Sequence, residues 1–314
     1  MSGFTSNRAI IAKDAVTTVD FQGTGQGGYL NPAQSSEFLR LMFDATAFLR
    51  DIRTVTMITP TQDLDYIGMN TRVLRLAAEG VAPSELIGVK TAKQQLEARE
   101  VILPFDVTDN VLEDTIERGN ADDTIAAMMA EQFGNDLCDL SLNGDSTKTD
   151  GDADGKFLKI GDGFVKIAKD SPDTHKVDTA GSVDYKDTIF PSMLATMPNK
   201  FKRRKNELRF YVSPTVAEAY TKQLSIRNTA LGDESLITGN LQRYAGVSIF
   251  ECEYMPDDVF ILTPNRNLAT GIFREVRNEH ERSPRKRLTE YTTTMRLDPA
   301  KIIWHEAVVI GYEV

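Results

Sequence analysis

The sequence predicts an α+β fold with an inserted two-stranded loop. Helical and strand-like patterns alternate irregularly along the 314 residues and do not repeat as strand–helix units. Short alternating pieces interrupt these patterns between residues 59 and 100, and a long helical pattern follows. An irregular order of this kind favours an α+β arrangement over a doubly wound parallel sheet.

The composition is that of a globular protein with an acidic balance. Hydrophobic residues make up 41% of the chain, charged residues 26%, and the net charge is −10. This length allows one large domain or two ordinary ones with an ample core. The negative charge argues against a dedicated DNA-binding protein, because phosphate contacts come from Lys and Arg. It is compatible with enclosing DNA without sequence-specific binding.

The cysteines and the apolar segments exclude several classes of protein. We expect Cys138 and Cys252 to be reduced, buried thiols. The chain has no pair of CxxC motifs, so we expect no structural metal and no cofactor. No stretch is apolar enough to span a membrane, and the start lacks a basic segment followed by an apolar run. We therefore expect no membrane partner and a cytoplasmic product.

The first elements are a polar segment, a helix and a strand. Residues 1–28 end in a glycine-rich run, and are interpreted either as a disordered tail or as an arm that becomes ordered on a partner. Asn31 and Pro32 then begin a helix. Apolar residues follow at three- and four-residue spacing: Phe38, Leu41, Met42, Ala45, Phe48, Leu49 and Ile52. Residues 53–57 are predicted to form a strand.

Residues 59–100 are predicted to form a ribbon that projects from the body. Alternating pieces occur at 64–68 and 71–76, and residues 93–103 alternate charged with apolar side chains. This pattern is typical of strands with one wet face. A two-stranded ribbon is only marginally stable in water. We therefore expect this one to bury its apolar side on a neighbouring subunit and not within its own chain.

A short helix at 110–118 and the longest helix, from about 120 to 142, are expected next. The stripe of the longer helix comprises Ile125, Met128, Met129, Phe133, Leu137 and Leu140. Asn143, Gly144 and Asp145 end it. Residues 147–182 are predicted to form a loop that holds one short structured piece at 157–167.

The remaining chain is predicted to mix helices and strands. Helices are expected at 184–197 and 215–226, the second begun by Ser213 and Pro214. Strands are expected at 208–212, 247–252, 259–262, 288–296 and 302–312. Trp304 is assigned to the core.

An Asp-rich loop is the sharpest candidate for metal chemistry. Asp150, Asp152 and Asp154 alternate before a glycine, as in the first half of an EF-hand loop. The twelfth position, however, is Gly161 and not the bidentate Glu, and the flanks do not read as the required pair of helices. A solvated turn is the favoured interpretation, and a calcium-dependent binding module stays open as a distant alternative.

Enzymatic chemistry has little support in the sequence. The three histidines are His175, His280 and His305, and neither GxSxG nor HExxH occurs. We therefore expect no catalytic residues, with an enzyme site assembled in space as a distant alternative. Two basic runs, at 200–205 and 274–287, are interpreted as solvated faces or as contacts with neighbouring copies or nucleic acid.

Several short motifs, taken in order, resemble one protein family. Ala78, Glu79 and Gly80 resemble an acidic-glycine motif of an extended loop. The sequence at 99–110 resembles the segment that leaves this loop. Residues 126–145 resemble a spine helix that ends in Asn-Gly-Asp, and 210–215 resemble a strand-to-helix transition. The last match is a glycine at 246 followed by Met255 and Pro256. From about Asn31 onward, the chain thus resembles the major capsid proteins of tailed bacteriophages, whose Hong Kong ninety-seven fold is shared with encapsulins.

The resemblance implies a division of the chain into five segments. These are an N-terminal arm and first helix (1–57), an extended loop (58–104), a peripheral domain with the spine helix (105–183), an axial domain (184–287) and strands returning to the peripheral domain (288–314).

The resemblance also implies a function and partners. Many copies, as pentamers and hexamers, would form an icosahedral shell around double-stranded DNA in the virion capsid, assembled in the host cytoplasm. A portal and a separate scaffolding protein are the further partners. A compartment shell of the encapsulin type, with cargo enzymes, is the alternative. The expected subunit contacts are Phe38, Leu41, Arg72, Arg75, Glu79, Gly80, Lys93 and Arg99.

Overall fold

The structure is a computed structural model, which describes residues 39–43, 46–68, 90–108, 121–152, 154–179, 184–225, 243–273 and 276–312. The expectations for residues 1–38 and for a helix at 110–118 lie outside these ranges. No helix within the described ranges has the length and apolar character needed to cross a membrane. The described chain combines helices and sheets, as the α+β prediction requires.

The helix predicted up to Ile52 is interrupted. Residues 39–43 are helical, but Thr46 is extended, with φ −122° and ψ 134°, before α3 (Ala47–Asp51) begins. Thr46 is β-branched, which favours an extended backbone over a helical one. Its side chain is buried. The apolar stripe is nevertheless confirmed, because Met42, Phe48 and Leu49 are all buried. The strand predicted after it is β1 (Arg53–Met57).

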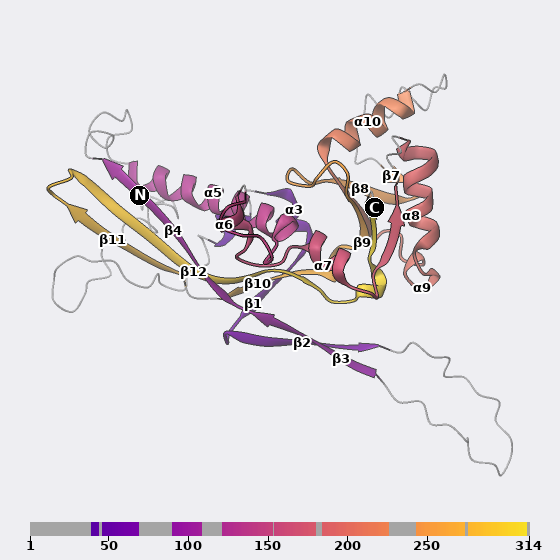
Figure 1. The fold of residues 1–314 in the computed structure, drawn as a ribbon, viewed down its shortest axis with the longest axis horizontal. Helices are drawn as coiled ribbons and strands as arrows, with labels where there is room; N and C mark the ends of the chain where they lie inside the picture. Colours follow the sequence, from indigo (N-terminus) through magenta and orange to yellow (C-terminus); the bar gives the residue numbers. More distant parts are fainter. Residues whose placement is uncertain are drawn as a thin grey trace, which may run out of the picture.

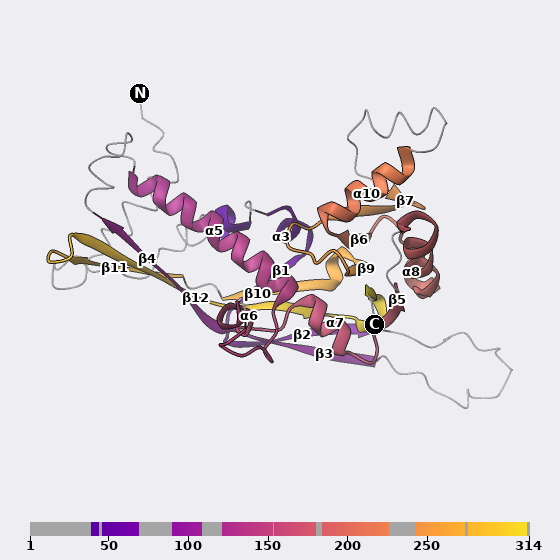
Figure 2. The ribbon, with the colours of Figure 1, turned by 45° about the horizontal axis from the view of Figure 1, so that its top comes forward.

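Within the described residues, five strands form the first sheet. Its path is β1, β10 (Leu268–Phe273), β12 (Leu288–Ile302) and β11 (Arg277–Ser283), and β4 (Arg99–Thr108) pairs with β12 as well. The C-terminal part of β12 pairs with β10, and its N-terminal part pairs with both β11 and β4. The long helix α5 (Ala121–Asn143) and the short helix α7 (Phe164–Asp170) pack on β12 (Figures 1 and 2).

A second sheet forms the other lobe of the molecule. Its order is β5 (His175–Asp178), β13 (Val309–Tyr312), β9 (Phe260–Pro264), β6 (Leu208–Val212), β8 (Val247–Glu251) and β7 (Arg243–Tyr244). Three helical segments pack beside it: the π-helix η1 (Tyr185–Ile189), α8 (Phe190–Thr196) and α10 (Pro214–Ser225) (Figure 1). The Asp184 carboxylate accepts a hydrogen bond from the Asp187 amide, which caps η1 as its position predicted.

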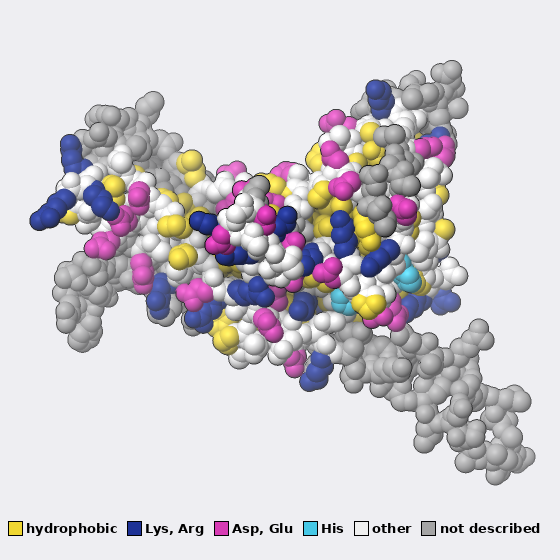
Figure 3. Space-filling view, viewed as in Figure 1, with side chains coloured by type: hydrophobic (Ala, Val, Ile, Leu, Met, Phe, Trp, Pro, Cys, Tyr) yellow, Lys and Arg dark blue, Asp and Glu magenta, His cyan; other side chains and the backbone are white. Residues whose placement is uncertain are grey.

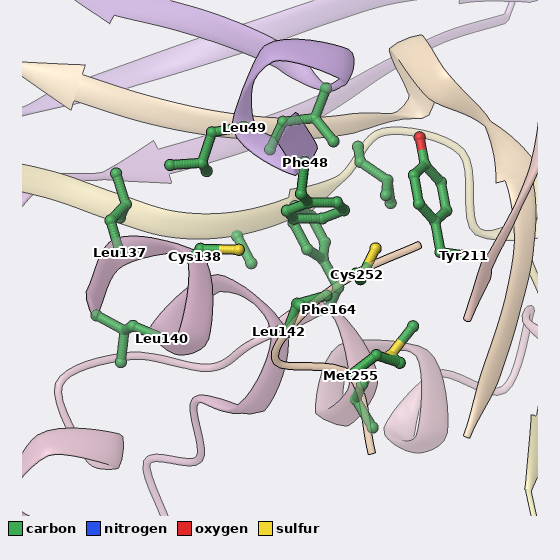
Figure 4. Close-up of a cluster of buried hydrophobic side chains, with 14 of the residues drawn as sticks. Phe48, Leu49, Leu137, Cys138, Leu140, Leu142, Phe164, Tyr211, Cys252 and Met255 are labelled. Carbon is green, nitrogen blue, oxygen red and sulfur yellow. The ribbon is translucent and has the colours of Figure 1, made fainter. Parts of the chain in front are cut away.

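The main hydrophobic cluster joins the two lobes. Phe48 of α3 lies edge-on to Phe164 of α7, with ring centroids 6.1 Å apart, and to Tyr211 of β6, at 5.5 Å (Figure 4). Edge-to-face pairs of this kind contribute about 0.5–1.5 kcal/mol each beyond burial. Cys138 and Cys252 lie in the same cluster as free, buried thiols, which confirms that prediction. Burial raises the pKa of Cys138 to about 12.

Several predicted elements differ from the structure. The strand expected at 93–103 is two strands, β3 (Lys90–Glu97) and β4, which meet at Ala98. The loop expected at 147–182 holds α6 (Gly155–Leu158), α7 and β5. Strands β10 and β11 were not predicted. In β11 charged residues occupy both faces of a strand whose one partner among the described residues is β12. The sequence therefore carries no alternation to reveal it.

Two residues assigned to the core are exposed. Trp304 is 38% exposed and precedes the 3-10 helix η3 (His305–Ala307), where a late strand was expected. Met128, on the predicted stripe of α5, is 63% exposed. Phe133, Leu137 and Leu140 of the same stripe are buried as predicted.

Candidate assembly surfaces

A two-stranded ribbon leaves the body beside the first sheet. Strand β2 (Thr61–Gly68) pairs antiparallel with β3, from Thr61 opposite Glu97 to Gly68 opposite Lys90. In Figure 1 the two strands lie on one side of the body, below both sheets. The residues that join them, 69–89, lie outside the described ranges.

The root of the ribbon packs on its own chain, contrary to expectation. Leu64 of β2 and Leu96 of β3 are both buried. They belong to a cluster, here called the root cluster, whose buried members are Val55, Met57, Leu64, Leu96, Ala269 and Ile303. The expectation that the ribbon buries no apolar side within its own chain is therefore wrong for the root, because β1 and β10 supply an apolar surface that the local pattern of residues 59–100 does not reveal.

The expected subunit contacts fall on both described and undescribed parts of the chain. Five of them lie outside the described ranges: Phe38, Arg72, Arg75, Glu79 and Gly80. The Lys93 ammonium lies 3.6 Å from the Asp63 carboxylate across the ribbon, and both side chains are largely exposed. The Arg99 guanidinium donates to the carbonyl of Ile160 at 2.6 Å. Leu41 is half-buried against the main cluster.

One face of β4 has a large apolar side chain that is exposed to solvent. Val101 and Leu103 point toward the main cluster, whereas Ile102 is 64% exposed. Ile102 is paired with Thr294 of β12, and the neighbouring Glu100–Arg296 pair has a 3.3 Å separation. Ile58, just after β1, is 81% exposed. Sequence reasoning missed both residues, although Ile102 shares its face with the charged residue at position 100.

The second basic run forms the end of a hairpin. Arg282, Arg285, Lys286 and Arg287 are exposed around the turn between β11 and β12. Dark blue side chains mark this end of the molecule in Figure 3. Lys286 pairs with Glu290 at 2.8 Å. The charges of the run thus extend beyond the body and face solvent.

The first basic run makes contacts with other elements of the second lobe and with η3 (His305–Ala307). Lys200, in α9 (Asn199–Lys202), pairs with Glu306. The ammonium groups of Lys202 and Lys205 donate to backbone carbonyls, that of Lys205 at 2.9 Å to Ala245. These contacts indicate that this run stabilises the second lobe.

Two carboxylates of the Asp-rich loop, those of Asp150 and Asp152, have partners nearby in the sequence. Asp150 pairs with Lys159. Asp152 accepts hydrogen bonds from the amide and the hydroxyl of Thr149, at 2.8 and 3.1 Å. Asp154, with φ +52°, precedes α6. Across the described residues, no group of three or more His, Cys, Asp or Glu is arranged to hold a metal ion.

A polar cavity of about 180 Å³ lies where the ribbon meets the body. The titratable side chains that line it are Glu97, Arg99, Asp162, Asp298, Lys301 and His305. Burial lowers the pKa of His305. None of the described residues that line the cavity is a Ser, Thr or Cys. The cavity therefore offers no side-chain hydroxyl or thiol nucleophile next to its histidine.

The fold defines a class of protein. A long helix packed on a sheet, a projecting ribbon and a second lobe with its own sheet are the parts of the Hong Kong ninety-seven capsid fold. A chain of the satellite phage P4 procapsid that includes the size determination (Sid) protein superimposes with a TM-score of 0.72, at 14% identity, over 97% of this chain and 95% of that one. The capsid of the native GTA particle gives 0.60 at 15% identity, over 99% and 100%.

The sequence identifies the family. The chain is 32% identical over 308 residues to YqbE of Bacillus subtilis (strain 168), a protein whose name assigns it to a prophage capsid; the match covers 93% of this chain and 94% of the relative. No protein-family model matches the chain. The chain therefore belongs to the family of major capsid proteins of tailed bacteriophages, and it is a structural protein of the virion. The encapsulin alternative is not favoured.

Proposed function

We propose that many copies of this chain, grouped as pentamers and hexamers, assemble into an icosahedral shell that encloses the double-stranded DNA genome of a tailed phage. The observation that carries this proposal is the ribbon. Its root is packed on the body, so the two strands leave the subunit in a fixed direction. A projecting ribbon with an anchored root is suited to lie across a neighbouring subunit, where a third surface would relieve the marginal stability of two strands.

Both the expected contacts and the exposed apolar residues are proposed to lie at subunit interfaces. The first group is Phe38, Leu41, Arg72, Arg75, Glu79, Gly80, Lys93 and Arg99. Arg99 uses one guanidinium nitrogen within its own chain, which leaves donors for a neighbour. Ile58, Ile102 and Met128 are added because large apolar side chains in water mark interaction sites when they gather with other contacts. Interfaces of obligate assemblies bury on the order of 2,000–5,000 Å².

The lobes are assigned to the domains of the proposed shell protein. The proposed peripheral domain (105–183 and 288–314) and axial domain (184–287) follow the two lobes except at four strands. Strands β10 and β11 pair within the first sheet, and β5 and β13 pair within the second. Residues 58–104 are the extended loop, and 1–57 the arm and first helix. A scaffolding protein and a portal are the proposed partners during assembly in the host cytoplasm. The net charge of −10 suits a container that does not adsorb its DNA.

Sedimentation and electron microscopy of the chain expressed alone test the proposal. Closed shells, or regular rings and tubes, are the expected result. Particles from infected cells should protect double-stranded DNA from nuclease, whereas a protein cargo would support a compartment shell. A chain that stays monomeric alone and with its scaffolding partner would contradict the proposal.

A further inference from the structure

The ladder between β10 and β12 is irregular at the place where the ribbon joins the body. Ala269 pairs with Lys301, but Gly271 pairs with Asp298, so β12 holds one extra residue between the two pairs. A β-bulge of this kind redirects side chains and disrupts the local ladder. Here it places Asp298 beside Gly271, next to the root cluster.

Gly271 allows three groups to meet at this point. A Cβ atom on Gly271 would lie 2.9 Å from Met57 Sδ, 3.3 Å from Leu96 Cδ1 and 3.4 Å from Asp298 Cβ. The first distance is shorter than a normal contact and the second is tight, so a side chain at 271 would displace the sulfur of Met57 in β1 and crowd the ribbon residue Leu96. The sheet and the ribbon therefore pack closely because position 271 has no side chain.

The Asp298 carboxylate then holds the end of the ribbon. Its Oδ2 accepts a hydrogen bond from the backbone amide of Glu97, the last residue of β3, at 2.9 Å. Asp298 is 9% exposed. Burial raises the pKa of its carboxyl group, and the Glu97 amide and the charges of Lys301 and Arg99 counteract that rise. A buried carboxylate bound to a backbone amide makes a strong, directional contact.

Two further bonds fix the chain just beyond this contact. The amide of Ala98 donates to the carbonyl of Pro60 at 2.8 Å, which ties the two ends of the ribbon together. Arg99 donates to Ile160, in the turn between α6 and α7. Between them, these bonds restrain the step from β3 to β4. The hydrogen bond from the Glu97 amide to Asp298 joins the end of β3 to β12, the strand of the first sheet that pairs with β4, β10 and β11.

We infer that Asp298 is a positioning residue for assembly: through the Glu97 amide it sets the direction in which the ribbon leaves the body, and thereby the place where the ribbon meets a neighbouring subunit. The second half of this inference, that the ribbon direction decides where a neighbouring subunit is met, rests on the proposed function. The first half concerns the isolated subunit and can be tested without any shell.

Hydrogen exchange of the full-length chain in its unassembled form, read at single amides by NMR, tests the first half. In the wild-type chain the Glu97 amide should exchange slowly. Asp298→Ala should accelerate that amide by about 10- to 100-fold, the effect of losing a hydrogen bond to a charged group. Asp298→Asn keeps an acceptor oxygen of the same shape, and it should restore slow exchange. Amides of β6 and β9 in the second lobe are the internal reference and should not change.

Assembly of the same variants tests the second half. Asp298→Ala should give misshapen particles or unassembled subunits in sedimentation and electron microscopy, and Asp298→Asn should give normal shells. If Asp298→Ala does not fold, Gly271→Ala replaces it, because its Cβ would crowd Met57 and the ribbon residue Leu96 without removing the carboxylate. Rapid exchange of the Glu97 amide in the wild type, or normal shells from a variant with accelerated exchange, would overturn the inference. If the wild-type chain forms no shells, the proposed function fails, while the exchange data still decide the role of Asp298.

Discussion

At the scale of single residues, the turn after α5 depends on Lys166. The Lys166 ammonium lies 2.6 Å from the Asp145 carboxylate and 2.8 Å from that of Asp162, and its side chain is 17% exposed. Hydrogen bonds from Lys166 and Thr147 hold the pKa of Asp145 well below its usual range. Lys166 thus links the end of the long helix to the start of α7.

Lys166→Met should lower the free energy of unfolding by about 1–2 kcal/mol at pH 7. The value is at the lower end for hydrogen bonds to charged groups, because both carboxylates retain access to water. Urea denaturation followed by circular dichroism measures it. Lys156→Met, which removes an exposed lysine from the neighbouring α6, is the control and should leave the stability within error.

The comparison of wild type with Lys166→Met also gives a pH dependence of stability with a defined sign. The folded-state pKa of Asp145 is depressed, so its stabilisation is fully present above the unfolded value of about 3.9 and is lost as the pH falls toward the folded value. The difference in stability between wild type and Lys166→Met should therefore be constant between pH 6 and 8 and shrink below about pH 4. A difference that grows on acidification would contradict the assigned role of the lysine.

At the scale of elements, the two faces of β4 are expected to have different roles, one in the folding of the subunit and the other in shell assembly. Ile102 points to solvent, whereas Val107 is 7% exposed. Ile102→Asp should leave the melting temperature of the subunit unchanged and abolish or reduce shell formation, with Ile102→Leu as the control that keeps an apolar contact. Val107→Asp buries a charge and should unfold the subunit. Normal shells from Ile102→Asp would remove this face from the interface.

The ribbon allows a second test at this scale. Gly68 and Lys90 are paired, so an Asn-Gly turn can join them directly in place of residues 69–89. This variant keeps Leu64 and Leu96 in the root cluster, and we expect a stable subunit that forms no shells. Deletion of residues 61–97 should cost stability as well, because it uncovers Met57 and Ala269. Calorimetry and sedimentation separate the two effects, and shells from the shortened ribbon would contradict the proposed role of its tip.

How far the sequence predicts these elements depends on how local their signals are. Residues 208–212 form a strand as predicted because four of the five residues are apolar or aromatic, and Pro214 begins α10 because proline fits the first helical turn. The bond between the Glu97 amide and Asp298 joins residues 201 positions apart, and Leu96 packs on residues of β1 and β10, so no local pattern contains them. The exposure of Met128 likewise depends on whether another element packs over that part of α5, which the helical spacing alone does not tell.

At the scale of the whole molecule, the two lobes share one core. Tyr211 and Ile261 of the second sheet belong to the same cluster as Leu297 of the first and Leu137 of α5. We therefore expect the isolated subunit to unfold in one cooperative transition. Denaturation followed by the fluorescence of Trp304, the one tryptophan in the sequence, and by far-ultraviolet circular dichroism should give coincident curves. Two separate midpoints would show that the lobes unfold independently.

The pairing of β4 with β12 also has a consequence during synthesis of the chain. Arg99 pairs with Leu297, and β1 pairs with β10, so the first sheet joins strands from opposite ends of the sequence. At 5–20 residues per second, a ribosome needs about 10–40 s between making the two partners. Throughout that interval β1 and β4 lack their native neighbours, and unpaired strands are prone to aggregate. Nascent subunits should accordingly bind chaperones until the C-terminal strands emerge.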